Sequence, residues 1–236
     1  MDIGIIGAGF IGGTLARKLA STGHSVHIAN SKDPSTLSEF AEIDGITPAW
    51  AAEAVTGVDV AILSLPVKEI DALSQDVVSA LSSVPVVIDT GNYYPVRDGR
   101  IDALDEGMAD SEWAASRLGR PVYKAFNNIV APSLKHKGTD NPAQRLGLTV
   151  AGPAGEGKQT VCSLIEQLGF DPVDAGDLEQ SWRLQPGTPT YCKDMTAEEM
   201  KTGITKTARD EIGKHRQERD QLQDFEGAMK QMSEFM

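Results

Sequence analysis

The hexapeptide Gly7-Ala8-Gly9-Phe10-Ile11-Gly12 decides the fold of this chain, because it joins two segments of different periodicity. The apolar run Asp2–Ile6 before it is typical of a buried strand. Residues 11–21 after it place apolar side chains at helical spacing, which is typical of an amphipathic helix. A glycine-rich turn between a strand and a helix predicts the first unit of a dinucleotide-binding domain.

Each glycine of this turn has its own use. Gly7 permits the tight turn, Gly9 lets the backbone approach a pyrophosphate, and Gly12 lets the helix pack closely on the strand. The start of the helix adds unpaired N–H groups and the positive end of a dipole for the anion. We therefore assign the whole turn, with Phe10 and Ile11 included, to a cofactor-binding site.

The first two-thirds of the chain alternates β-rich runs with helical ones, which predicts an α/β fold with a Rossmann-type, doubly wound, mainly parallel sheet. Because several β-rich runs are continuously apolar, the sheet is expected to be covered on both faces. The expected strands are Asp2–Ile6, Ser25–Ala29, 58–65, 84–89, 122–126 and Gly147–Ala151. The expected helices are residues 11–21, 34–42, 50–55, 68–81 and 157–168.

The composition changes at about Thr196, after which valine is absent and Lys, Arg, Glu, Gln and Met dominate. We therefore expect a dinucleotide-binding domain at residues 1–195 and a C-terminal helical extension at residues 196–236. Two apolar stripes at helical spacing support this extension: Met200, Ile204, Ala208 and Ile212, then Leu222, Phe225, Met229, Met232 and Met236. The helices would dock on the main domain or on a second copy of the chain, forming a homodimer. A disordered tail is the alternative.

The charge balance narrows the partners of the protein. The chain has 34 acidic residues against 22 Lys and Arg residues, and this net charge of −12 disfavours nucleic acid. No apolar run reaches the roughly 18 residues of a membrane helix, and the first residues are unlike a signal peptide. We expect a cytoplasmic protein that binds neither membrane nor nucleic acid. Two cysteines and four histidines without ligand spacing predict no metal site.

Asn30, Ser31 and Lys32 follow the second expected strand, where a dinucleotide fold distinguishes NAD from NADP. An NAD site usually places an acid there for the ribose hydroxyls, whereas this chain has none before Asp33. An amide, a hydroxyl and an ammonium group would bind a 2′-phosphate, which a carboxylate would repel. The sequence therefore favours NADP(H), with Asp33 capping the helix that Pro34 begins.

Further segments end expected strands at the same edge of the sheet, where ligands bind in open α/β folds. Ser64-Leu65-Pro66 is expected to border the ribose or the nicotinamide. The polar and aromatic loop 89–99 suits a ring-shaped substrate, and its Asn92 is expected to bind the cofactor by framing the nicotinamide together with Pro66. In the segment 124–128, small Ala125 would let a nicotinamide ring lie flat, and Asn127 would bind its carboxamide.

The sequence identifies no side chain as a proton donor. The Tyr-x-x-x-Lys pair of short-chain dehydrogenases is missing, because Tyr123 directly precedes Lys124. This absence suits a hydride transfer to a flavin-like ring, which needs proximity and stacking more than a dedicated acid. Cys162 is expected in the core, and Cys192, in a loop, is a weaker candidate for a functional thiol.

Together these segments resemble the NADPH-dependent deazaflavin-coenzyme (F-420 type) reductases and their broader bacterial relatives, the predicted dinucleotide-binding enzymes. The likeness spans about residues 1–190 and rests on residues 7–12, 30–32, 64–66, 89–99, 124–128 and 185–189. The family is also similar to the NADPH-binding domain of membrane metalloreductases, which passes hydride to a flavin. The resemblance implies a Rossmann-type domain, NADP(H) at the glycine turn and a planar acceptor over the nicotinamide.

The leading hypothesis is an NADP(H)-dependent oxidoreductase whose small-molecule hydride acceptor, or co-substrate, is a flavin or deazaflavin. One alternative is an NADPH-dependent reductase of a small carbonyl or imine. Enzymes of that kind append a large helical domain, and too few residues follow residue 180 to build one. The other alternative is a non-catalytic NADP-sensing module whose C-terminal helices signal to a partner. The residues alone leave both alternatives open.

Overall fold

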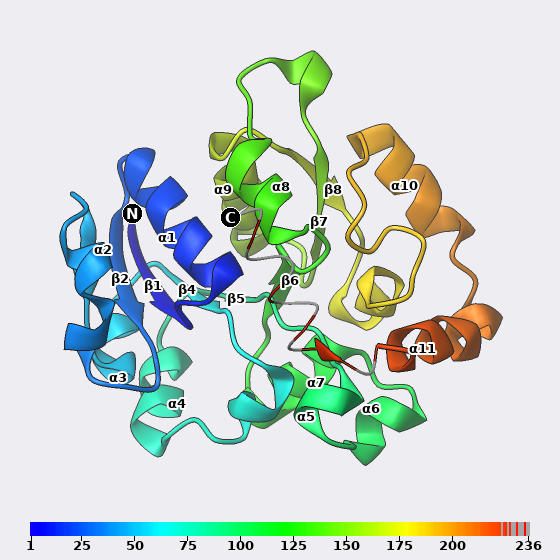
Figure 1. The fold of residues 1–236 in the computed structure, drawn as a ribbon, viewed down its shortest axis with the longest axis horizontal. Helices are drawn as coiled ribbons and strands as arrows, with labels where there is room; N and C mark the ends of the chain where they lie inside the picture. Colours follow the sequence, from blue (N-terminus) through cyan, green and yellow to red (C-terminus); the bar gives the residue numbers. More distant parts are fainter. Residues whose placement is uncertain (223, 226, 228–229, 231–233, 235–236) are drawn as a thin grey trace.

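The computed structural model describes residues 1–222, 224, 225, 227, 230 and 234, and an eight-stranded sheet forms its centre (Figure 1). The strands are β1 (Asp2–Ile6), β2 (Ser25–Ala29), β3 (Ile46–Pro48), β4 (Val60–Leu63), β5 (Val86–Asp89), β6 (Tyr123–Ala125), β7 (Gly147–Ala151) and β8 (Asp171–Asp174). They lie in the order β3-β2-β1-β4-β5-β6-β7-β8. Among the described residues, every neighbouring pair is parallel except β6 and β7. The mainly parallel sheet is therefore confirmed.

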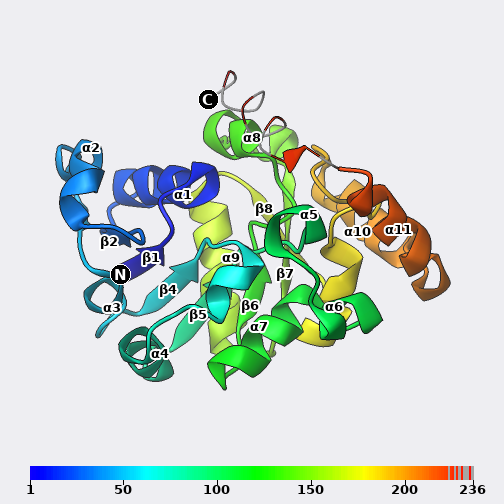
Figure 2. The ribbon, with the colours of Figure 1, turned by 60° about the horizontal axis from the view of Figure 1, so that its bottom comes forward.

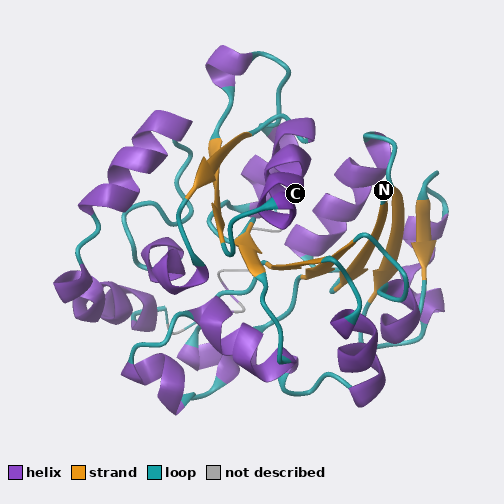
Figure 3. Ribbon diagram, turned by 180° about the vertical axis from the view of Figure 1, so that it is seen from behind, coloured by secondary structure: helices purple, strands orange, loops and turns teal. Residues whose placement is uncertain are grey.

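Two strands without the apolar run of a buried strand lie at the two edges of the sheet (Figure 3). β3 is three residues long and ends in Pro48, and β8 carries Asp171 and Asp174 at its ends. An edge strand is paired on one side only and is partly exposed, so it needs fewer apolar residues than a central strand. Their sequences therefore lack the continuous apolar run that predicts the central strands.

Helices cover both faces of the sheet, and each face has its own apolar core (Figure 2). The helices are α1 (Phe10–Ser21), α2 (Ser38–Ala41), α3 (Ala51–Ala54), α4 (Gln75–Ser82), α5 (Pro95–Asp98), α6 (Asp102–Glu106), α7 (Asp110–Leu118), α8 (Ala131–His136), α9 (Glu156–Gln167), α10 (Ala197–Lys206) and α11 (Ile212–Asp220). Leu15 of α1 and Leu164 of α9 belong to one core, and Leu81 of α4 and Trp113 of α7 belong to the other. The fold is therefore doubly wound, as the sequence predicts.

Two expected helices are interrupted by short 3-10 turns. Residues 34–42 form the turn η1 (Pro34–Leu37) and then α2, and Asp33 caps η1 by accepting a hydrogen bond from the N–H of Ser35 at 2.9 Å. Residues 68–81 divide into η2 (Val67–Ile70) and α4, which begins after Ser74. The hydroxyl of Ser74 accepts from a backbone N–H of the first turn, so a new helix starts there. Further 3-10 turns are η3 (Pro142–Gln144), η4 (Leu178–Leu184) and η5 (Arg209–Glu211).

In the described part of the C-terminal extension, α10 packs through an apolar face and α11 through a polar one. Met200 and Ile204 are buried in a core that α10 shares with β7 and β8. Because α10 ends at Lys206, Ala208 is exposed and the first expected stripe stops there. α11 turns His215 and Arg219 inward.

The second expected stripe falls mostly outside the described residues, which exclude Met229, Met232 and Met236. Phe225 is described and lies partly buried. No helix in the described part of the chain combines the length and the apolar character that a membrane span needs.

Candidate functional site

The turn between β1 and α1 is built from glycines that differ in the space around them. Gly7 has a φ of +108°, and a Cβ there would collide with the carbonyl oxygen of Ser64. A Cβ at Gly12 would collide with the carbonyl oxygen of Gly7. A Cβ at Gly9, which caps α1, would meet no atom within 4 Å. Open space therefore lies above the N-terminus of a 12-residue helix, as the approach of an anion requires.

A cavity of about 310 Å³ opens beside this turn and is called the central cavity below. It lies at the carboxyl ends of β1, β4, β5 and β6, whose following loops supply much of its wall. Its lining residues are Gly9, Phe10, Ile11, Ser64, Leu65, Pro66, Thr90, Gly91, Asn92, Tyr94, Arg97, Phe126, Asn127, Ile129, Val130, Ala131, Tyr191, Cys192 and Phe225. Open α/β sheets bind their ligands at this edge.

The structure brings most of the expected crevice residues together in this cavity. Those that line it are Gly9, Phe10, Ile11, Ser64, Leu65, Pro66, Asn92 and Asn127. Ala125 lies elsewhere: it is fully buried within β6, where it pairs with Val150 of β7. The next residue, Phe126, has a left-handed backbone with a φ of 60° and lines the cavity instead. The expectation that small Ala125 faces the ring is therefore corrected.

Asn30, Ser31 and Lys32 form the turn after β2, outside the central cavity. The Oδ1 of Asn30 orders this turn by accepting a hydrogen bond from the N–H of Lys32 at 2.8 Å. Ser31 and Lys32 are exposed. The hydrogen bonds of Asp33 with Ser35 lower the pKa of its carboxyl group, which is thus occupied in capping η1.

Two asparagines connect the loops that follow β5 and β6. The Nδ2 of Asn92 donates to the carbonyl oxygen of Asn127 at 3.0 Å. The Nδ2 of Asn127 donates to the Oδ1 of Asn92 at 3.1 Å and to the carbonyl oxygen of Leu184 at 2.8 Å. The Oδ1 of Asn127 is buried and accepts no hydrogen bond from a described residue. Because a buried acceptor without a donor is costly, this oxygen suits an incoming N–H group.

A pair of tyrosine hydroxyls lies in the wall of the central cavity and has no counterpart in a sequence motif. The hydroxyl oxygens of Tyr94 and Tyr191 are 2.7 Å apart. Burial raises the pKa of both phenols well above the ordinary tyrosine value, so both stay neutral. Burial also raises the pKa of the adjacent Cys192 thiol to about 11. Both tyrosine hydroxyls therefore keep their protons at neutral pH. Cys192 likewise stays a thiol and is not a thiolate nucleophile.

A buried ammonium group supports the cavity wall from behind. Lys124 is fully buried, and its Nζ donates to the carbonyl oxygen of Gly91 at 2.9 Å and to the Oγ of Ser111 at 3.0 Å. Ser111 donates to one carboxylate oxygen of Asp89 at 2.6 Å, and the N–H of Gly91 donates to the other at 2.9 Å. Since a buried charge needs partners, this network fixes the backbone next to the lining residue Asn92.

Two acidic residues in and after the loop 89–99, Asp98 and Asp110, are buried and bonded inside the protein. The carboxylate of Asp98 pairs with Arg97 at 2.8 Å. Asp110 is buried and accepts a hydrogen bond from the N–H of Tyr93 at 3.0 Å, and burial raises the pKa of its carboxyl group. From this segment it is Arg97, a cation, that lines the cavity. Within the described residues, no three His, Cys, Asp or Glu side chains are placed to hold a metal ion.

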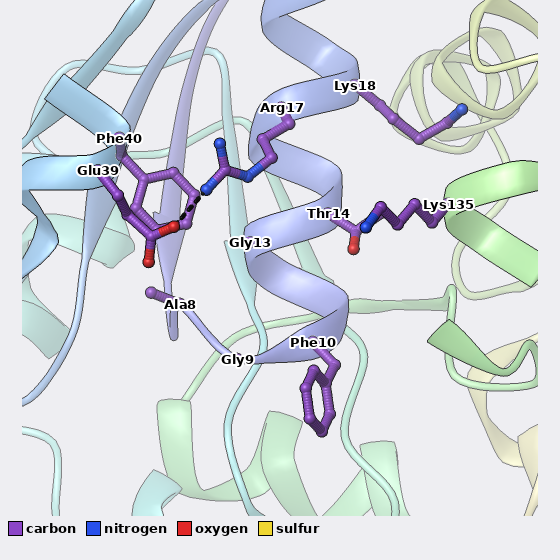
Figure 4. A pocket seen from close by; sticks show the side chains of 10 residues that line it. All are labelled: Ala8, Gly9, Phe10, Gly13, Thr14, Arg17, Lys18, Glu39, Phe40 and Lys135. Carbon is purple, nitrogen blue, oxygen red and sulfur yellow. Dashed lines mark hydrogen bonds and ion pairs between the residues drawn. The ribbon is translucent and has the colours of Figure 1, made fainter. Parts of the chain in front are cut away.

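A second, larger cavity of about 540 Å³ adjoins the central cavity at Gly9 and follows α1 (Figure 4). Its lining residues are Ala8, Gly9, Phe10, Gly13, Thr14, Arg17, Lys18, Glu39, Phe40 and Lys135. Arg17 forms an ion pair with Glu39 at 2.6 Å, and Lys135 extends from α8 toward α1. Burial lowers the pKa of Lys18. This groove is cationic, whereas the central cavity is mainly apolar and aromatic.

The N-terminal part of the chain matches a known family. Residues 2–93 match the family described as "NADP oxidoreductase coenzyme F420-dependent". The matched residues include β1 to β5, the glycine turn and the loop after β4. The resemblance drawn from the sequence is thereby confirmed, because residues 2–93 match the domain of an NADP oxidoreductase family.

Two individual proteins are similar to this chain over most of its length. Metalloreductase STEAP3 of Rattus norvegicus is 28% identical over 183 residues, or 75% of this chain. The chain spans only 41% and 34% of the lengths of the two curated relatives that it matches. The structure of a hypothetical protein, SMa0349 of Sinorhizobium meliloti, has a TM-score of 0.71 and 29% identity, covering 83% of this chain and 95% of that one.

A protein of Arthrobacter sp. FB24, proposed to be an F420-dependent NADP reductase, has a TM-score of 0.62 and 21% identity. The likeness covers 75% of this chain and 85% of that one. At this identity the likeness shows the Rossmann-like α/β fold alone.

Proposed function

Because residues 2–93 carry the domain of an NADP oxidoreductase family, we propose that this protein transfers a hydride between NADP(H) and a planar, flavin- or deazaflavin-like acceptor. The central cavity carries the proposal, since it extends from the glycine turn at Gly9 to the aromatic side chains Tyr94, Tyr191 and Phe225. Hydride transfer requires that two reacting rings be held in contact, and one continuous cavity allows this.

The phosphate groups of the cofactor would bind at two places. The open space above Gly9 and the N-terminus of α1 suits the pyrophosphate. Ser31 and Lys32, both exposed after β2, would bind the 2′-phosphate. The carboxylate of Asp33 accepts a hydrogen bond from the N–H of Ser35 and caps η1. These features favour NADP(H) over NAD(H).

The nicotinamide end of the cofactor would lie against Pro66 and Asn127. The unpaired Oδ1 of Asn127 would accept a hydrogen bond from the carboxamide. When bound, NADPH supplies the hydride from its nicotinamide ring. The Lys124 network holds Gly91 and therefore keeps Asn92, the partner of Asn127, in position.

A small carbonyl or imine is the second candidate substrate, and the tyrosine pair favours it. Reduction of a carbonyl or imine needs a proton as well as a hydride, and Tyr94 and Tyr191 present neutral hydroxyls at the cavity. A flavin-like ring can take its proton from water. A Tyr191→Phe variant should therefore lower turnover of a small carbonyl and leave reduction of a ring acceptor unchanged.

Stopped-flow absorbance of NADPH tests the proposal, with a deazaflavin, FMN, FAD, a ferric chelate and a small imine offered in parallel. Rapid oxidation with a ring acceptor is the expected result. Turnover with the imine alone would favour the second candidate. Saturable NADPH binding without oxidation by any of them would contradict both and favour a non-catalytic NADP sensor.

A further inference from the structure

Phe225, close to the C-terminus, lines the same cavity as Gly9 close to the N-terminus. The ring centroid of Phe225 lies 5.2 Å from that of Tyr94, and the two rings are inclined by 55°. The guanidinium carbon of Arg97 lies 4.9 Å from the Phe225 centroid and 5.6 Å from the Tyr94 centroid. Tyr94, Arg97 and Phe225 therefore form one side of the cavity, called the aromatic wall below.

Arg97 gives this wall a fixed framework. Its Nε and Nη2 donate to the two carboxylate oxygens of Asp98 at 2.9 and 2.8 Å, and the Asp98 side chain is fully buried. The same Nη2 donates to the carbonyl oxygen of Asn92 at 2.5 Å. A bidentate pair with a buried carboxylate fixes the plane of the guanidinium group. Both rings thus lie against a cation whose position is set by the main domain.

The chain reaches the aromatic wall from α11, which is anchored beside α6 (Figures 1 and 2). The Nη1 and Nη2 of Arg216 donate to the carbonyl oxygens of Asp105 and Leu104 at 2.8 and 2.9 Å. These carbonyls belong to α6, and a cation at the carboxyl end of a helix satisfies groups that the helix leaves unpaired. Arg219 lies over the ring of Tyr93 at 4.9 Å. The extension is therefore docked on the segment that carries Tyr94 and Arg97.

We infer that the C-terminal extension completes the acceptor site, and that Phe225 determines its preference for planar aromatic rings over compact acceptors. The inference rests on the proposed function and deepens it, because it assigns the choice of acceptor to a residue outside the matched family domain. A flat ring against Phe225 and Tyr94 gains stacking and dispersion contacts. A ferric chelate or a small imine covers little of either ring.

Binding of the cofactor should not depend on Phe225. In the described part of the chain, the ring contacts of Phe225 are with Tyr94 and Arg97. The residues proposed for NADP(H) belong to the loops after β1, β2, β4 and β6, and none of them is a ring partner of Phe225. Loss of the Phe225 ring is therefore expected to change the affinity for the acceptor alone.

The test compares Phe225→Ala, Phe225→Leu and Phe225→Tyr in the full-length protein, with Glu218→Ala on the exposed side of α11 as the control. Steady-state rates with NADPH give KM for FMN, a deazaflavin and a ferric chelate. A fluorescence titration of the NADP⁺-loaded protein gives the dissociation constant of FMN without turnover. Phe225→Ala should raise both constants for the ring acceptors about tenfold. Phe225→Leu should have a smaller effect, and Phe225→Tyr and Glu218→Ala should behave like the wild type.

The outcomes separate this inference from the proposed function. Ring-acceptor constants unchanged in Phe225→Ala would overturn the inference and leave the proposed function intact. If Phe225→Ala weakened NADPH binding as much as acceptor binding, the inference would also be overturned. The Phe225 ring would then support the whole cavity and not the acceptor site alone. If FMN binds without being reduced, the proposed function fails, and the dissociation constants of the variants still decide the role of Phe225. A wild-type protein that neither binds nor reduces any ring contradicts both.

Discussion

The glycine turn and the C-terminal extension meet in one cavity, but different forces hold them in place. At the turn, side chains at Gly7 or Gly12 would collide with the backbone, and two apolar cores cover the sheet behind it. α11 is instead held by the guanidinium group of Arg216 on carbonyl oxygens, and it buries polar residues. The side of the cavity proposed for the cofactor, at the glycine turn, is therefore part of the packed sheet, whereas the extension that carries Phe225 on the side proposed for the acceptor is attached to it by polar contacts.

This difference implies separate responses to mutation. Protein cores are close-packed, so a change in the sheet affects the whole fold. A segment with few buried apolar contacts can open locally at a lower free energy than global unfolding. The side proposed for the acceptor can therefore change while the side proposed for the cofactor stays intact, and the variants below test this separation.

The largest effect is expected from Lys124→Met, which removes the buried ammonium group behind the cavity. The carbonyl oxygen of Gly91 and the hydroxyl of Ser111 would lose their donor, and breaking a buried charged network costs about 3–5 kcal/mol of unfolding free energy. Urea unfolding measures this loss. The exposed Lys68→Met is a matched control and should change the free energy by less than about 0.5 kcal/mol. Equal stability of the two variants would show that the network does not hold the sheet together.

Two alanine variants of the glycine turn should separate stability from cofactor binding. Gly12→Ala places a Cβ against the carbonyl oxygen of Gly7, and such overpacking costs about 1–3 kcal/mol. Gly9→Ala places its Cβ in open space, so thermal unfolding should stay unchanged. The same Cβ would obstruct the pyrophosphate and weaken NADPH binding by about tenfold. A destabilised Gly9→Ala with normal NADPH affinity would contradict the assignment of this space to the cofactor.

Lys32→Glu changes the charge at the proposed 2′-phosphate site without touching the packed sheet. The variant should weaken NADPH binding about tenfold more than NADH binding, because only NADPH carries the repelled phosphate. Fluorescence titration with both dinucleotides measures the ratio, and Lys206→Glu, exposed at the end of α10, is the control. An equal loss for NADPH and NADH would rule out the 2′-phosphate assignment.

The smallest effect is expected from Arg216→Ala, and it should be local. Its two hydrogen bonds to carbonyl oxygens are partly exposed, so their loss should cost about 1 kcal/mol of docking free energy. Hydrogen exchange should become faster in the amides of α11 and remain unchanged in β1 and β4. Equal acceleration in the central strands would mean that the extension unfolds together with the sheet and that the two regions are not separate.

The cofactor side could be predicted from the sequence because its requirements are local. A glycine spacing, a buried strand and a helix face are each contained in a few consecutive residues, and they predicted β1, the turn and α1. The edge strands β3 and β8 could not be predicted, because partial exposure removes the need for an apolar run. The breaks inside residues 34–42 and 68–81 depend on single capping residues that a search for long helices overlooks.

The rest of the central cavity could be predicted only where a loop directly follows a strand, as at Asn92 and Asn127. Tyr191 and Phe225 come from segments far along the chain, and tertiary contacts bring them to the cavity. One such contact, Arg216 on the carbonyls of α6, leaves no periodic pattern in the sequence. Ala125 ends β6 and is fully buried, whereas the next residue, Phe126, has a left-handed backbone and lines the cavity.

The polar docking of α11 makes the acceptor side sensitive to dissolved ions. Arg219 lies 3.9 Å from a carboxylate oxygen of Asp105, and Arg100 lies 3.8 Å from one of Asp220. Mobile ions screen such pairs, whereas they do little to the two apolar cores. Cooling acts in the opposite way, because it weakens burial of apolar surface and hardly affects charged contacts. A higher ionic strength would thus loosen α11 more than the sheet, and with it the side of the cavity proposed for the acceptor.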